Sequence, residues 1–452
     1  MVKTELVNYD IYPKVFPCGK AVEVTIKPLG AHVAFSGEYT IQVKALNQGF
    51  WKRYPERNNL SEYVVTPDED GYLRFTHTYM DEQEHHIEIV RDDNMLVRLN
   101  VYSLEADLCG RYPFRGDLHM HTCRSDGRQA PAIVAAEYRK NGYDFISITD
   151  HDVYYGSLEA INTFRDVPIE YNILTGEEVH LEGNDIHIVN FGGKYSINAL
   201  MPGDHHADVG DGKDLRSIDG ECPEIISVEE YVRQVNELIE TLDIPDGIEK
   251  FTYAACVWIF NNIRKADGLG IFCHPYWVCE SRYYSTPEEN DCLLRHGSFD
   301  ALEIGNYKVE RMCLLNARIL ELARECGFRK PFIGASDWHA RPIQFSDKDY
   351  TMIFAPTPEF EDFARAIRSE YCVAVGGYQD EFTFGSFRLI QYANFLRTYF
   401  FQPLHDPLCK KQGELLLEAH RNNAADFSEI VQLKTEIDNL SNSLSSPKSM
   451  KK

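Results

Sequence analysis

Histidines and carboxylates gather in short clusters across the middle of the chain, each where an apolar run meets a polar loop. The clusters are Asp117-Leu-His-Met-His-Thr122 with Ser125-Asp126-Gly127, Thr149-Asp-His-Asp152, Gly176-Glu-Glu-Val179, Asp185-Ile-His-Ile188, Cys273-His-Pro275 and Ser336-Asp-Trp-His339. Imidazole and carboxylate groups together are ligands for Zn²⁺, Mn²⁺ or Fe ions, and enough are present for more than one ion. The sequence therefore predicts a metal centre.

The first cluster places two histidines at the end of an expected strand over 116–121. His119 and His121 are two residues apart, so both imidazoles point the same way and can reach one ion. Such a pair alone would suit two surface histidines equally well. Four of the other clusters also lie at the carboxyl ends of expected strands, whereas Asp185-Ile-His-Ile188 begins one. The carboxyl ends of strands carry the active site in parallel α/β folds.

The elements that would position these clusters alternate in type from about residue 113. Strand-like runs are expected at 116–121, 145–150, 171–179, 186–191, 269–274, 301–304 and 331–336. Helical patterns are expected near 130–141, 228–241, 250–266, 308–326 and 358–369. This alternation indicates a parallel α/β architecture, either an open sheet or a closed barrel. The stretch 201–226, rich in Gly, Asp and His, interrupts it and is interpreted as an inserted loop.

The two ends of the chain differ from this middle part. Residues 1–110 contain several short alternating runs separated by turn residues, which predicts a small β-sandwich with an accessory role. Near the C-terminus one apolar stripe has members three and four residues apart: Ile430, Leu433, Ile437, Leu440 and Leu444. It fits a helix packing on its own domain and also a partner-helix or homodimer contact. The last eight residues are expected to form a disordered tail.

Composition excludes some classes of partner. The chain has 452 residues, with 46 Lys and Arg against 70 Asp and Glu, giving a net charge of −24. This balance argues against holding long nucleic acid or an anionic membrane by charge. The N-terminus is too polar for a signal peptide, and the most apolar stretch, 254–260, is too short to span a bilayer. Twelve cysteines without a C-x-x-C pair fit reduced thiols in a cytoplasm.

Taken together, the clusters resemble the PHP (polymerase and histidinol phosphatase) family of metal-dependent phosphoesterases. The resemblance runs from about Arg115 to Gly377. It implies a distorted (β/α)7 barrel over 113–378. The N-terminal β-sandwich domain (1–110) would precede this barrel, and a helical C-terminal extension (385–452) would follow it.

The resemblance also implies nine metal ligands in three groups. The first group is His119, His121, Glu178 and Asp337; the second shares Glu178 as a bridge and adds His187 and His274; the third is Asp126, His151 and His339. These groups would hold two or three divalent ions (Mn, Zn or Fe), and all the ligands except His187 are also expected to be catalytic. Glu177 competes with Glu178 as the bridge, and the G-x-E pattern of the family favours Glu178.

Other polar residues near the clusters have plainer interpretations. His180 is interpreted as a structural histidine, His205 and His206 as parts of a solvated loop, Cys123 and Cys273 as ordinary thiols, and Asp117 and Asp150 as groups that orient ligand imidazoles. Three arginines lie in loops where they could bind phosphate, although each also suits a surface salt bridge: Arg124, Arg282 and Arg341.

Clustered divalent ions lower the pKa of a bound water and neutralise phosphoryl oxygens. We therefore expect a phosphoesterase that hydrolyses phosphate monoesters or nucleotide-like small substrates through a metal-bound hydroxide, with His339 or His151 helping to expel the leaving group. Three alternatives stay open. They are an exonuclease on short oligonucleotides, an amidohydrolase-type metal hydrolase and a PHP-like scaffold without activity. Amidohydrolases usually bridge their metals with a modified lysine, a position that Glu178 takes here.

Overall fold

The computed structural model describes residues 5–50, 52–54, 60–203, 214–305, 309–339, 349–376, 382–422 and 427–445. The chain divides into two units. The first comprises Met1–Arg111, Phe387–Gln412 and Ser428–Lys452, and the second Tyr112–Ser386 and Gly413–Phe427. Within the described residues, the helices lack the combination of length and apolarity that crossing a membrane would need.

The first unit is built on two β-sheets that share one apolar core. After the short helix α1 (Glu5–Asn8), the three-stranded antiparallel sheet has the order β1 (Tyr9–Tyr12), β3 (Lys20–Pro28), β6 (Leu73–Tyr79). The five-stranded sheet has the order β2 (Val15–Pro17), β8 (Asn94–Leu104), β7 (Gln83–Arg91), β4 (Tyr39–Ala45), β5 (Ser61–Val65). Alternate side chains such as Val24 in one sheet and Ile41 in the other are fully buried in that core, as the period of two requires.

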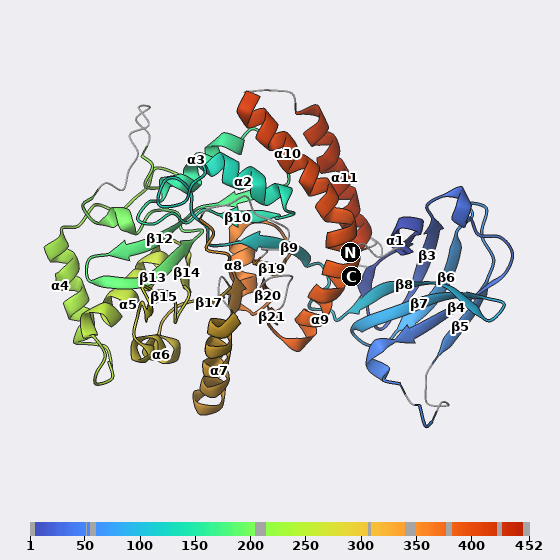
Figure 1. Cartoon of the computed structure of the whole chain (residues 1–452), viewed down its shortest axis with the longest axis horizontal. Coiled ribbons are helices and arrows are strands. Elements are labelled where there is room, and N and C mark those ends of the chain that lie inside the picture. Colours follow the sequence, from blue (N-terminus) through green and yellow to red (C-terminus); the bar gives the residue numbers. More distant parts are fainter. Residues whose placement is uncertain are drawn as a thin grey trace. The chain divides into compact units, whose positions relative to one another are not determined.

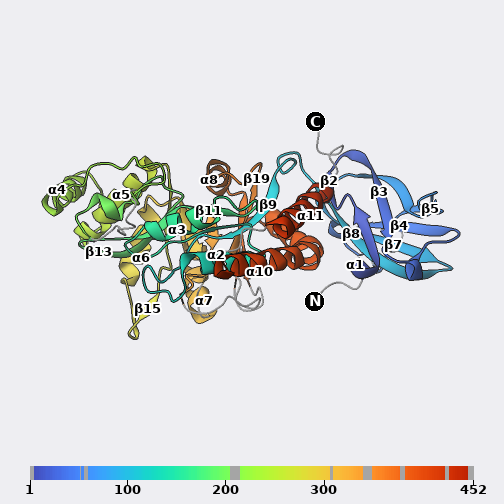
Figure 2. The same ribbon diagram turned by 90° about the horizontal axis from the view of Figure 1, so that it is seen from above.

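Helices from the end of the chain belong to this same unit. They are α9 (Phe387–Leu396), a π-helical stretch (Arg397–His405), the start of α10 (Asp406–Asn422) and α11 (Ser428–Leu444). The stripe residues Ile430, Leu433 and Ile437 are buried, and the Lys14 backbone N–H donates to the carbonyl of Leu444, so that α11 ends beside β2 (Figure 2). The stripe therefore needs no partner helix to be covered.

The second unit contains two mixed sheets. One has the order β11 (Asn172–Leu174), β10 (Phe145–Ser147), β9 (Tyr112–Asp117), β19 (Tyr350–Ala355), β20 (Cys372–Gly376), β21 (Phe382–Phe384). The other has the order β12 (Gly176–Leu181), β13 (Asn184–Phe191), β14 (Leu269–Phe272), β17 (Ala301–Ile304), β18 (Phe332–Gly334). Strands β9 to β11 are parallel, as are β14, β17 and β18, whereas β13 is antiparallel to both of its neighbours.

The expectation of a parallel α/β architecture is therefore confirmed only in part, because both sheets are mixed. Strand β12 returns directly as β13 through a tight turn in which Gly183 has φ +73°. Such a short connection joins antiparallel strands and leaves no room for a crossover helix. Isolated bridges from Met120 to Trp338 and from His151 to Glu178 link the two sheets. The sheets thus form a curled half-barrel, and the closed (β/α)7 barrel stays a prediction.

Helices pack on these sheets. They are α2 (Pro131–Lys140), α3 (Tyr155–Phe164), α4 (Val228–Ile239), α5 (Lys250–Lys265), α6 (Pro287–His296), α7 (Val309–Cys326) and α8 (Phe360–Arg368). Helices α4 and α5 lie along β12 to β14 (Figure 1), where Tyr231 and Ile259 pack with Ile188. Five helices are close to their predicted ranges, whereas α3 and α6 were not predicted. The predicted insert is described except for 204–213, and the predicted tail lies outside the described residues except for Ser445.

Candidate metal centre

The first and last clusters of the sequence lie side by side in the second unit. Strand β9 ends at Asp117, so His119 and His121 follow it in an extended segment rather than closing it. The backbone N–H of Asp337 donates to the carbonyl of His119 (2.9 Å), and that of His121 donates to the carbonyl of Trp338 (2.8 Å). These bonds fix both histidines opposite Asp337.

Glu178 is the centre of the cluster. Its side chain is fully buried, and ring nitrogens of five histidines lie within 3.6 Å of its oxygens. They are His187 (2.6 Å), His151 (2.9 Å), His119 (3.3 Å), His121 (3.4 Å) and His274 (3.6 Å). Yet neither oxygen has a hydrogen bond of acceptable geometry within the part of the chain that is described. Buried polar atoms are almost always satisfied, so this arrangement of donors fits divalent cations shared by the carboxylate.

Asp337 adds a second carboxylate to the side chains that surround Glu178. Its Oδ1 lies 3.0 Å from His121 Nε2 and 3.5 Å from His119 Nε2. Asp337 and His274 both have positive φ, 47° and 25°, a region that costs a non-glycine residue about 1–3 kcal/mol. The surrounding structure therefore holds both side chains in place against local preference. We call His119, His121, Glu178, His187, His274 and Asp337 the inner group.

Burial and mutual contacts shift the pKa values of several inner-group side chains. Burial raises the pKa of Glu178, but His187 and His119 outweigh it and bring this pKa well below its usual value. Burial lowers the pKa of His121 and of His187 to about 4. At neutral pH the glutamate is thus charged and these two imidazoles are neutral, which are the forms that bind metals. Burial also lowers the pKa of His119, but the charges of Glu303 and Glu178 raise it by more than burial lowers it. The net pKa of His119 therefore lies well above the usual value.

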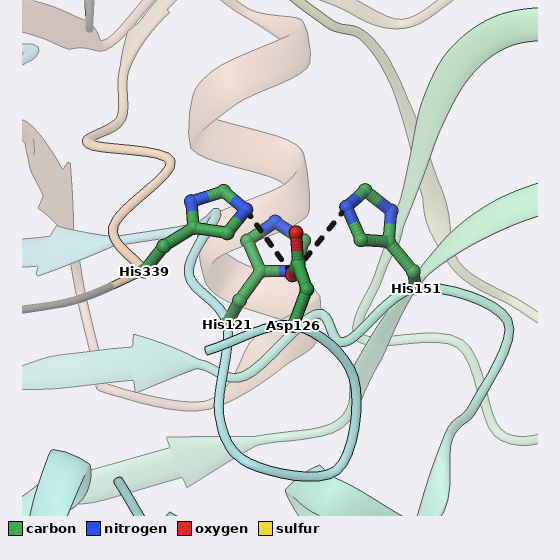
Figure 3. A group of neighbouring side chains, drawn as sticks. All are labelled: His121, Asp126, His151 and His339. Carbon is green, nitrogen blue, oxygen red and sulfur yellow. Dashed lines mark ion pairs between the residues drawn. The ribbon is translucent and has the colours of Figure 1, made fainter. Parts of the chain in front are cut away.

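A second set of side chains, drawn in Figure 3, is partly exposed to solvent. Asp126 Oδ1 is 3.3 Å from His339 Nε2, 3.7 Å from His151 Nε2 and 3.8 Å from His121 Nδ1. We call Asp126, His151 and His339 the outer group. The next residue, Gly127, is constrained by a close approach, because a Cβ there would lie 2.6 Å from the backbone of His121. The structure thus brings all nine predicted ligands into two adjoining groups.

Asp117 and Asp150 accept hydrogen bonds from backbone and hydroxyl groups of the segments that carry the ligands, and their role in orienting the ligand imidazoles stays a prediction. Asp150 accepts hydrogen bonds from the Thr122 N–H (2.6 Å) and the Ser125 hydroxyl (2.7 Å). Asp117 accepts one from the Ser336 N–H (3.2 Å). These carboxylates fix the loops that carry the ligands, because a loop tied at its own backbone cannot swing its side chains out of the site.

Glu177 has a structural role. Its carboxylate accepts four hydrogen bonds, from Ile197 N–H (2.5 Å), Ser196 Oγ (2.6 Å), Asn190 Nδ2 (3.0 Å) and Asn198 Nδ2 (3.0 Å). Neighbouring residues of a strand point to opposite faces, so Glu177 faces away from the histidines that surround Glu178. This geometry supports Glu178, rather than Glu177, as the bridging candidate.

One residue of the site, Glu303, was not predicted from the sequence. Glu303, on β17, is fully buried and its Oε2 lies 2.7 Å from His119 Nδ1, which leaves Nε2 of that ring facing Glu178. Its only sequence signal is an acidic residue inside the apolar run Ala301-Leu-Glu-Ile304. His180, interpreted from the sequence as a structural histidine, has its Nε2 2.9 Å from His151 Nδ1.

Replacing Glu303 by glutamine should weaken metal binding roughly ten- to a hundredfold, because a carboxylate behind a ligand histidine raises its basicity. The Kd for Mn²⁺ can be measured by competition with a chromophoric chelator. Glu137→Gln, which alters another largely buried glutamate paired with Lys140, should leave the Kd unchanged. An unchanged Kd in the folded Glu303→Gln protein would contradict the positioning role.

The three arginines that were predicted as phosphate-binding candidates lie in different surroundings. Arg124 donates to Glu159 (2.7 Å) and is thus a salt-bridge partner at the surface. Arg282 is exposed on β16 (Arg282–Tyr283). Arg341 lies outside the described residues, as do His205 and His206.

Comparisons with known proteins give distant similarities. No protein-family model and no curated protein match the chain. A two-domain protein from Bacteroides vulgatus, described as containing a predicted PHP-like metal-dependent phosphoesterase, is 18% identical over 64% of this chain and 71% of that one, with a TM-score of 0.39. A protein from Bifidobacterium adolescentis, whose description as a metal-dependent phosphoesterase is likewise a prediction, is 18% identical over 56% and 94%, with a TM-score of 0.30.

Two solved structures similar to this chain thus carry the PHP-like or phosphoesterase description. A third, an amidohydrolase from Chromobacterium violaceum with bound sulfate and no metal, is 20% identical over 50% of this chain and 87% of that one, with a TM-score of 0.27.

Proposed function

We propose that this chain is a PHP-type metal-dependent phosphoesterase that hydrolyses phosphate monoesters or nucleotide-like small substrates. The observation that carries the proposal is Glu178, a buried carboxylate that faces five histidines and has no hydrogen bond of its own among the described residues. Divalent cations shared between this carboxylate and the histidines would satisfy these atoms, since an unpaired polar atom in the interior costs free energy.

The two groups suit different tasks in this reaction. The inner group, with Glu178 shared, has the donors for two ions, and divalent ions there would lower the pKa of a coordinated water and offset phosphoryl charge. The outer group is open to solvent, with His151 24% exposed and His339 31% exposed. Burial lowers the pKa of His151, but its contact with Glu178 raises it more, so the net pKa lies above the usual value. His151 or His339, through a bound metal or a hydrogen bond, would help to expel the leaving group on this side of the site.

The test compares the full-length protein stripped with a chelator and the same protein reloaded with Mn²⁺. We expect phosphate release from p-nitrophenyl phosphate to rise on the order of a thousandfold on reloading, since metal ions contribute several kcal/mol at a phosphoryl transition state. A nucleoside monophosphate, a short oligonucleotide and a set of amides and lactones complete the panel. Cleavage of an amide or lactone without any phosphoester hydrolysis would overturn the proposal in favour of an amidohydrolase. Hydrolysis of the oligonucleotide alone would favour the exonuclease.

A further inference from the structure

His180 lies on the same face of β12 as Glu178. The two residues are two positions apart on one strand, so both side chains point toward the ligand histidines. Asn198 fixes this part of the strand, because its Oδ1 accepts from the His180 N–H (3.0 Å) and its Nδ2 donates to the carbonyl of Glu178 (3.1 Å). The His180 side chain is 22% exposed. The strand therefore holds this side chain against the cluster.

The ring of His180 contacts two ligand candidates. It meets the rings of His187 and His151 edge-on, with centroids 4.5 Å and 4.8 Å away. Its Nε2 forms a hydrogen bond with His151 Nδ1 at 2.9 Å. Glu178 Oε2 is also 2.9 Å from His151 Nδ1, but within the described part of the chain no hydrogen bond of acceptable geometry reaches that oxygen. His180 is thus the better-aligned partner for this nitrogen of His151.

The other ring nitrogen of His151 determines what this contact can do. His151 Nε2 belongs to the outer group and lies 3.7 Å from Asp126 Oδ1 (Figure 3). A neutral imidazole has one N–H and one lone pair, so a ring that binds an ion at Nε2 carries its proton on Nδ1. Metal-binding histidines almost always donate this second N–H to an acceptor. The Nε2 of His180 is in place to accept it.

We propose that His180 is a positioning residue of the outer group. Its Nε2 accepts the Nδ1 proton of His151, so that the Nε2 lone pair of His151 is presented to an ion shared with the rest of that group. Because His180 takes this proton, both oxygens of Glu178 stay available to the inner group. The inference rests on the metal centre of the proposed function, but it does not depend on which ester is cleaved.

The acceptor behind His151 differs from the one behind His119. Glu303 places a carboxylate oxygen 2.7 Å from His119 Nδ1, and a carboxylate in this position raises the basicity of a ligand imidazole. An imidazole that accepts a proton is uncharged, so His180 raises the basicity of His151 less. The outer group therefore holds its ion more weakly than the inner group does, and a chelator removes the outer ion first.

The test measures bound ions rather than activity. Titration of Mn²⁺ into the metal-free full chain, in competition with a chromophoric chelator, gives the number of ions and the Kd of each. His180→Leu should raise the Kd of the weakest ion roughly ten- to a hundredfold, the usual effect of removing the partner of a ligand histidine. His180→Gln, whose amide oxygen can accept the same proton, should restore most of the affinity. The matched control His296→Leu, which alters an exposed histidine at the end of α6, should leave every Kd unchanged.

Asp126→Asn identifies which ion is affected, because it removes the carboxylate of the outer group. It should cost one ion per chain, the one with the highest Kd, and adding His180→Leu to it should leave the Kd values of the remaining ions unchanged. The inference is overturned if Asp126→Asn removes a more tightly bound ion or removes none. These two results need no variant of His180, so they decide the matter even if His180→Leu does not fold.

The remaining outcomes separate this inference from the proposed function. If His180→Leu leaves every Kd unchanged, or weakens the ions that remain in Asp126→Asn, His180 does not position the outer group and the phosphoesterase stands. If the wild type and the variants show the expected Kd values but the loaded wild type hydrolyses no phosphoester of the panel, the proposed function fails and the role of His180 stands. A wild type that binds no Mn²⁺ overturns both.

Discussion

Replacing Glu178 by glutamine should remove the bound metal and reduce kcat/KM at least on the order of a thousandfold, because the change removes the charge shared by the inner group. Ring nitrogens of His187, His151 and His119 lie 2.6 to 3.3 Å from the Glu178 carboxylate. A glutamine has nearly the same shape, but one of its two terminal groups donates hydrogen bonds and binds no cation. The effect therefore measures the loss of a ligand rather than the loss of packing.

The adjacent Glu177 offers a matched control on the same strand. Its carboxylate accepts four hydrogen bonds from the chain, so Glu177→Gln should lower the free energy of unfolding by about 1.5–3 kcal/mol. The metal content of the folded protein, measured by elemental analysis, should stay at the wild-type value. The assignment would be reversed if Glu177→Gln lost its metal while Glu178→Gln kept it.

Replacing His339 by alanine should reduce kcat for p-nitrophenyl phosphate by roughly a hundredfold or more, the usual contribution of a positioned acid or base. His339 is 31% exposed and reaches Asp126 from the solvent side, at 3.3 Å (Figure 3). Its removal should therefore leave the inner group intact, and elemental analysis should show a loss of at most one ion per chain.

The exposed His296, at the end of α6, provides the control for His339. His296→Ala changes the same kind of side chain in the same unit, and kcat should stay at the wild-type value. Two results would count against a role for the outer group in the chemical step. One is a wild-type kcat in His339→Ala. The other is the loss of all the ions from that variant, which would mean that His339 supports the inner group instead.

Much of the candidate site can be predicted from the sequence because its ligands come in local patterns. The pair His119 and His121 shares a face through its spacing, and the preference for Glu178 over Glu177 agrees with the alternation along β12. Glu303 could not be found in this way. It contacts His119 from 184 residues away, and a single carboxylate within an apolar strand carries no pattern of its own.

The fold was partly predictable for a similar reason. Apolar periodicity reveals helices such as α5 and α8 because it is a local property of the chain. The direction of a strand relative to its neighbours is not a local property, because a buried apolar run has the same sequence pattern in a parallel and in an antiparallel pair. The antiparallel pairing of β12 with β13 depends on the turn at Gly183, and the association of α11 with β2 depends on contacts between the two ends of the chain.

His121 contacts both the inner and the outer group, so the binding of ions by the two groups is not independent. Its Nε2 lies 3.0 Å from Asp337 and its Nδ1 lies 3.8 Å from Asp126, while its ring stacks on His339 with centroids 4.1 Å apart. A neutral imidazole has one lone pair and one N–H, so an ion taken at Nε2 leaves a donor aimed at Asp126. Occupancy of the inner group then changes the affinity of the outer group for its own ion, and linkage requires the reverse effect to be equal. The affinities of the two groups for their ions would therefore be linked, with His121 as the residue that couples them.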